Sequence, residues 1–97
     1  MKRGMQQALV SLEEQLATNT LTTGMDVRVH GDNLIVGRPA GEQKRDDRVR
    51  LTRLNVSSWG LSVKRHTGRW ERTPFSGTMK EMVEVIWTLM QHLVAPY

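Results

Sequence analysis

Residues 25–36 read MDVRVHGDNLIV, and this stretch decides the fold because it encodes a β-hairpin with a defined register. Apolar and polar residues alternate from Met25 to His30, which is the period of a strand with one buried face. Gly31-Asp32 is a glycine-first two-residue turn of the kind that closes such hairpins. The turn predicts two facing pairs whose four apolar side chains share one buried face: Val27 with Val36, and Val29 with Leu34.

A second set of alternating segments follows a charged loop over residues 38–46. The next strand begins near Asp47, and its apolar residues fall out of phase in a way that predicts a bulge near Thr52-Arg53. A further strand begins at Trp59, and Thr67-Gly68 is expected to close a two-residue hairpin turn. In that register Lys64 faces Glu71, and the following strand turns Trp70 towards the buried face.

Two helices are predicted, one at each end of the strands. Met5, Leu9, Leu12 and Leu16 recur at helical spacing and predict an amphipathic helix over residues 3–18. Thr78 followed by Glu81 forms a capping-box sequence that predicts the start of a helix over residues 79–94, ended by Pro96. Leu89 is expected in its core face.

This order of elements predicts an α+β fold in one domain over residues 1–97. We expect an N-terminal helix, a five-stranded antiparallel meander sheet and a C-terminal helix, with both helices on one sheet face. The opposite face of the sheet is then left to solvent. The 97 residues include no cysteine, which excludes disulfides and thiolate metal sites.

The order of elements is similar to the frataxin layout, most of all from Trp59 to Met90. Frataxins present an acidic ridge on the first helix and first strand. Here that region offers only Glu13, Glu14 and Asp26, and Arg28 and His30 lie beside them. The resemblance therefore implies an element order and carries no iron-handling role to this chain.

The sequence gives no sign of an active site. The histidines at 30, 66 and 92 are far apart and have no partner at metal-ligand spacing, so we expect no metal, cofactor or small-molecule ligand. The serines lie in no nucleophile motif, and the paired carboxylates lie on exposed stripes or in a charged loop. We therefore expect a protein that is not an enzyme. No apolar run approaches the roughly 20 residues of a membrane span, and a cytoplasmic location is expected.

The net charge of +4 is concentrated in the middle of the chain. Between residues 25 and 73, eleven basic residues oppose six acidic ones, and nine of the eleven are arginine. Strand alternation places a basic set on the open sheet face, which predicts binding to nucleic acid or another polyanion. That face lacks a stacking ring, because all three tryptophans are expected inward, and a merely solvated face stays open as the alternative. The predicted binding residues are Arg28, His30, Arg48, Arg50 and Lys64.

The C-terminal helix supports a second interpretation. Its apolar arc is wider than one sheet face needs, so it could also pair with a second copy of the chain or dock on a protein partner. The predicted residues of such an interface are Trp87, Met90 and Val94.

Overall fold

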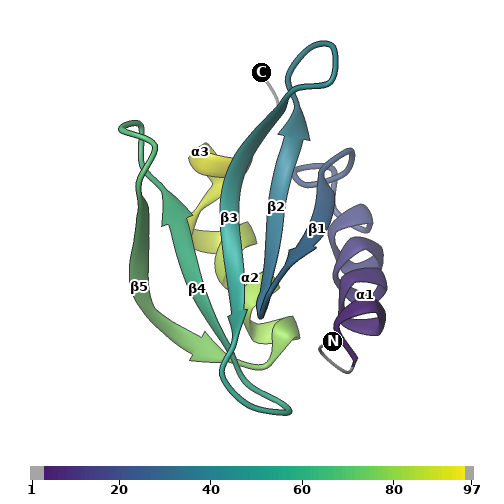
Figure 1. Ribbon diagram of the computed structural model, residues 1–97, viewed down its shortest axis with the longest axis vertical. Helices are drawn as coiled ribbons and strands as arrows, with labels where there is room; N and C mark the ends of the chain where they lie inside the picture. Colours follow the sequence, from purple (N-terminus) through teal and green to yellow (C-terminus); the bar gives the residue numbers. More distant parts are fainter. Residues whose placement is uncertain (1–3, 96–97) are drawn as a thin grey trace.

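The computed structural model describes residues 4–95 (Figure 1). In chain order, one helix is followed by five strands and then by two helices. The strands pair in chain order and each pair is antiparallel, so the sheet is a meander and the predicted α+β fold is confirmed. The elements are α1 (Met5–Ala17), β1 (Asp26–His30), β2 (Asn33–Pro39), β3 (Arg45–Arg53), β4 (Trp59–Lys64), β5 (Trp70–Gly77), α2 (Met79–Leu89) and α3 (Gln91–Val94).

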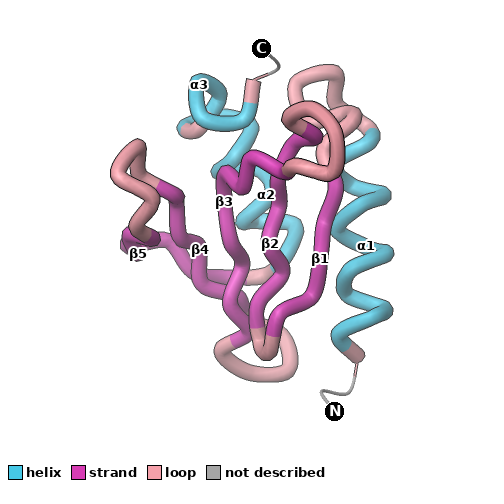
Figure 2. Tube along the Cα trace, turned by 45° about the horizontal axis from the view of Figure 1, so that its top comes forward, coloured by secondary structure: helices cyan, strands magenta, loops and turns pink. Residues whose placement is uncertain are grey.

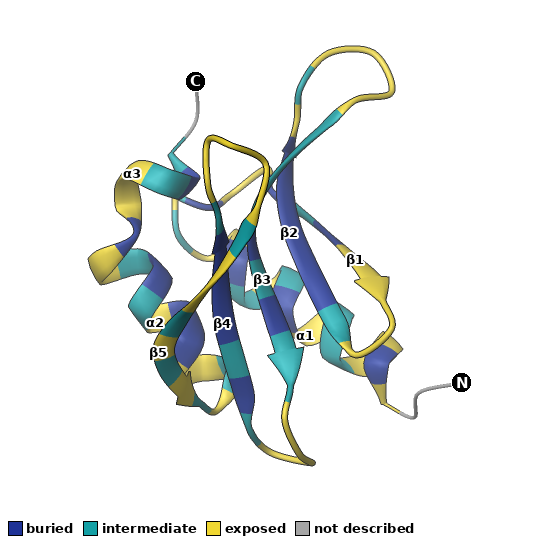
Figure 3. Cartoon of the chain, turned by 60° about the vertical axis from the view of Figure 1, so that its left-hand side comes forward, coloured by how far each residue is buried: buried dark blue, intermediate teal, exposed yellow. Residues whose placement is uncertain are grey.

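The helices cover one face of the sheet and leave the other face open (Figure 2). Leu12 of α1 and Ile86 of α2 are fully buried against the inward side chains of the strands, such as Leu51. Buried residues accordingly run along β2 and β4, whereas the hairpin loops are exposed (Figure 3). The predicted start of the first helix, at residue 3, lies outside the described residues. Within residues 4–95, every helix is too short or too polar to cross a bilayer.

The first hairpin has the register that its turn predicts. Val27 pairs with Val36 and Val29 with Leu34, and Gly31 adopts the positive φ of 62° that the turn requires. Val29 was expected to be buried but is 38% exposed. It belongs to the edge strand β1, which has a neighbour on one side only.

The bulge of β3 is not where the sequence pattern placed it, near Thr52-Arg53. The register shifts where Val36 pairs with Val49 and Gly37 with Asp47, so that Arg48 is the additional residue. A Cβ on Gly37 would lie 2.9 Å from the carbonyl oxygen of Asp46, so this close approach requires glycine. The apolar residues after Thr52 fell out of phase because β3 ends at Arg53 and they belong to an exposed loop.

The second hairpin differs from its predicted register by one residue. Lys64 pairs with Trp70 and Ser62 with Arg72, because the turn has three residues between Arg65 and Arg69 instead of two. Its last residue, Gly68, has a φ of 87°, as three-residue hairpin loops require. A slip of one residue moves every side chain of a strand to the other face. Trp70 therefore lies on the open face, and the expectation that it is buried against the helices is wrong.

The C-terminal helix begins as predicted but is broken. Thr78 and Glu81 form the capping box, with the backbone N–H of Glu81 donating to the Thr78 hydroxyl at 3.1 Å. The helix stops at Met90, whose φ of −122° is not helical, and a short second helix follows. Leu89 points to solvent with 58% of its surface exposed, so its expected place in the core is wrong.

This break gives the two apolar residues Ile86 and Leu89 opposite roles. Ile86→Ala removes a fully buried side chain and should lower the free energy of unfolding by about 2 to 5 kcal/mol. Leu89→Ala should change it by no more than about 0.5 kcal/mol, as at other surface positions. Urea unfolding followed by circular dichroism measures both. Equal losses would mean that Leu89 is buried in solution.

Candidate nucleic-acid interface

One row of neighbouring residues crosses the open face of the sheet from β1 to β5. From one edge of the sheet to the other, the row consists of Arg28 of β1, Ile35 of β2, Arg50 of β3, Ser62 of β4 and Arg72 of β5. An arginine therefore stands on every second strand, at intervals of about 10 Å given the usual strand spacing. The row contains no acidic residue.

Trp70 lies on the same face, next to this row. The guanidinium carbon of Arg50 is 4.8 Å from the centre of the Trp70 ring, and the Lys64 amine is 5.8 Å from it. Both separations are in the range of cation–π interactions. Arg72 extends from the same strand two residues further on and therefore on the same face. We refer to these four residues, Arg50, Lys64, Trp70 and Arg72, as the Trp70 cluster.

The charges of the open face divide into a neutralised side and a basic side. Near β1, Arg28 pairs with Asp47 at 2.9 Å and Arg45 pairs with Asp26 at 2.6 Å. In the described residues 4–95, the three cations of the Trp70 cluster have no carboxylate within ion-pair distance. The positive charge of the face is therefore concentrated over β3, β4 and β5.

The structure brings together only two of the five predicted binding residues, Arg50 and Lys64. Arg28 is on the open face but engaged with Asp47. His30 is exposed at the end of β1, and β2 separates that strand from β3.

Arg48 does not project from the open face as expected. It is the bulged residue of β3, and its guanidinium donates to the carbonyl oxygen of Leu93 in α3 at 2.6 Å and pairs with Asp46 at 2.9 Å. Arg72 and Trp70 were missed because the turn before them was assigned two residues. Gly68, at the third position of that turn, is the signal that could have corrected the register.

The residues predicted for a helix interface lie in the chain's own fold. Met90 is 5% exposed and Val94 fully buried. Trp87 is half-buried, and its indole N–H donates to the hydroxyl of Thr22 at 3.0 Å. Apart from the exposed Leu89, the apolar arc expected to be too wide for one sheet face is therefore packed against α1, the sheet and the connector after α1.

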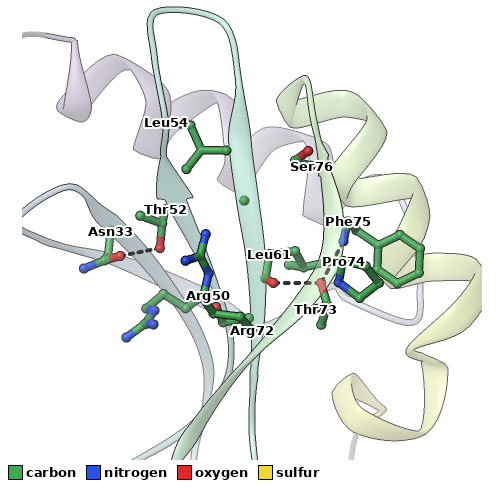
Figure 4. A pocket seen from close by; sticks show the side chains of 12 residues that line it. Asn33, Arg50, Thr52, Leu54, Leu61, Arg72, Thr73, Pro74, Phe75 and Ser76 are labelled. Atoms are coloured by element: carbon green, nitrogen blue, oxygen red, sulfur yellow. Dashed lines mark hydrogen bonds between the residues drawn. The ribbon is translucent and has the colours of Figure 1, made fainter.

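A groove of about 500 Å³ adjoins the Trp70 cluster on the open face (Figure 4). At one side the Thr52 hydroxyl donates to the side-chain oxygen of Asn33 at 2.6 Å. At the other, the Thr73 hydroxyl donates to the carbonyl oxygen of Leu61 at 2.8 Å. Figure 4 shows Arg50 and Arg72 between these two hydrogen bonds, so the groove and the cluster share both arginines.

Among residues 4–95, no three histidine, aspartate or glutamate side chains are grouped so that they could hold a metal ion. The carboxylates of the face, Asp26 and Asp47, are held by arginines. In comparisons with protein-family models, curated proteins and solved structures, the chain matches none.

The position of Trp70 can be tested by its contribution to stability. Trp59 is 5% exposed, and Trp59→Ala should cost about 3 to 5 kcal/mol of unfolding free energy. Trp70→Ala should cost about 1 to 2 kcal/mol, the sum expected of two cation–π contacts. Chemical denaturation of the two variants measures the difference. A loss at Trp70 as large as that at Trp59 would restore the register expected from the sequence.

Proposed function

We propose that this protein binds nucleic acid through the Trp70 cluster, without catalysing a reaction. The observation that carries the proposal is two cations, Arg50 and Lys64, in contact with the Trp70 ring on an open sheet face, with a third, Arg72, two residues along the same strand. Such a surface offers charge to phosphates and a flat ring to bases. We place this activity in the cytoplasm, because a chain without cysteine needs no oxidising compartment for disulfide formation.

Arginine is suited to this role by its geometry. A guanidinium presents a planar fork of N–H donors that binds two oxygens of one phosphate, and its plane also stacks on aromatic rings. Arg50 is already held over Trp70, which restricts its side chain before any ligand arrives. Less conformational entropy is then lost on binding.

Arg50 also has an unused donor. Its Nε atom is buried and lacks an acceptor among residues 4–95. A buried donor without a partner costs about 1 to 3 kcal/mol. A phosphate drawn to the terminal nitrogens of the same guanidinium would offset part of that cost by its charge, with the side chain still over Trp70.

Protein association through the C-terminal helix is the weaker proposal. Met90 and Val94, two of its three residues, are buried in the core of the chain, so a partner could reach them only if that core opened. The Trp70 cluster needs no such rearrangement. A sheet face that is merely solvated remains as the outcome in which no polyanion binds.

The proposal is tested by titrating a labelled oligonucleotide with the protein and with two charge-reversed variants. With three phosphate contacts, the affinity of the native protein for a single strand should fall roughly twentyfold between about 50 and 200 mM salt. Arg72→Glu should weaken binding by about tenfold at the lower salt concentration and flatten the salt dependence, because it removes one contact. Fluorescence anisotropy measures both quantities.

Lys80→Glu is the matched control. Lys80 is an exposed residue of α2, on the helical side of the sheet, and its reversal changes the net charge by the same amount. Its affinity should stay close to that of the native protein. An equal loss of affinity in both variants would mean that binding depends on net charge alone and not on the Trp70 cluster. No binding by the native protein at low salt would exclude the proposal.

A further inference from the structure

The groove beside the Trp70 cluster exists because one strand position has no side chain and another strand bends away. Gly60 lies between Thr52 of β3 and Ser76 of β5, in a row parallel to the arginine row. Next to it, the three residues from Thr73 to Phe75 stand opposite Leu61 alone. Pro74 in this segment has no N–H to donate to the ladder, and the additional residues bend β5. The floor at Gly60 thus has no side chain of its own and is flanked by the Leu54 methyl groups.

The walls of the groove combine apolar and hydrogen-bonding groups. Leu54 is 48% exposed and forms one apolar wall, and Pro74 forms another. Asn33 uses its side-chain oxygen to accept from Thr52, so its amide nitrogen keeps both donors available among the groups of residues 4–95. A slot with apolar walls at Leu54 and Pro74 and polar side chains between them offers the chemistry that binds a flat heterocycle with polar edges.

Two arginines of the groove place a candidate phosphate site beside this slot. Arg50 and Arg72 line the groove on the side that faces the Trp70 cluster. An anion held by them would therefore lie beside the slot. The arrangement of an apolar slot beside a phosphate site corresponds to a nucleotide whose base is inserted and whose phosphate stays at the surface.

We infer that the groove takes one unpaired nucleobase, so that the ligand is a single strand and not a duplex. This inference rests on the proposed function and adds the class of nucleic acid to it. In a duplex the bases are stacked and paired and cannot enter a slot on a sheet face. In a single strand one base enters the groove while Trp70 stacks or contacts a neighbouring base.

The test separates binding of the base from binding of the phosphates. Three labelled ligands of about 12 units, within the usual range of site sizes, are titrated at low salt: a single-stranded DNA, an abasic strand with the same phosphates, and a duplex. The native protein should bind the base-containing strand at least about fivefold more tightly than the abasic strand, because a stacked base contributes about 1 to 3 kcal/mol. The duplex should bind no better than the abasic strand.

Gly60→Val is the decisive variant because it fills the floor of the groove without changing charge. A Cβ at this position would meet the Leu54 methyl groups at 3.6 Å, an ordinary contact, so the strand can accept a side chain there. We expect the variant to bind the base-containing strand as weakly as the abasic strand, with abasic binding unchanged. Gly60→Ala, which fills less of the groove, should give an intermediate loss.

Leu54→Ala provides a second route should Gly60→Val fail to fold. Its side chain is half exposed, in the loop between β3 and β4, and removing it should weaken binding of the base-containing strand severalfold and leave the abasic strand unaffected. The inference would be overturned if the native protein bound the base-containing and abasic strands equally, or bound the duplex more tightly than the base-containing single strand. In either case the proposed function would stand. Binding of none of the three ligands would overturn both.

Discussion

The buried guanidinium of Arg38 holds the helical layer against the sheet. Arg38 is 7% exposed and donates to three backbone carbonyl oxygens: those of Leu21 at 2.6 Å, Thr23 at 3.1 Å and Val94 at 2.9 Å. A buried cation is tolerated only when hydrogen bonds replace its hydration. These three carbonyls come from the connector after α1 and from the end of α3, so one side chain of β2 joins both of these segments to the sheet.

The bulge in β3 supports the same arrangement. Because β3 has one residue more than β2 at Gly37, Arg48 is released from the strict alternation of the strand and reaches the carbonyl oxygen of Leu93. Arg38 and Arg48 thus satisfy carbonyl groups that the short last helix leaves without intrahelical partners. Both arginines have structural roles, although composition alone would count them among the basic residues available to a ligand.

The arginines of the open face fall into two groups, those paired with an aspartate and those of the Trp70 cluster. Asp26 and Asp47 neutralise the β1 side of the open face, and the Trp70 cluster is left with its charge. Local charge density, and not the net charge of +4, therefore distinguishes the candidate site. The ring of Trp70 adds a stacking surface that a purely basic patch lacks. The site depends on a strand register that brings an indole and three cations from three strands to one place.

The sequence by itself determined the features that nearest neighbours along the chain control. The glycine-first turn at Gly31 determined the register of the first hairpin, and the capping box at Thr78 determined where α2 begins, because each uses hydrogen bonds within a few residues. The order of elements and the α+β fold followed from the change between helical and strand periods. Two residues of the candidate site, Arg50 and Lys64, were predicted because they lie on strands whose phase was correct.

Only the tertiary structure decided the features that depend on distant contacts. The bulge at Arg48 requires the close approach of Gly37 to Asp46, and the break at Met90 buries Val94 while it exposes Leu89. Neither has a signal in the adjacent sequence. The face of Trp70 is a different case, because Gly68 in the adjacent turn carries a local signal for it. One additional turn residue exchanges the two faces of the strand, since its alternation has a period of two. Local hydrogen bonds set where each element begins, whereas packing between elements set which side chains reach solvent and therefore which residues can bind a ligand.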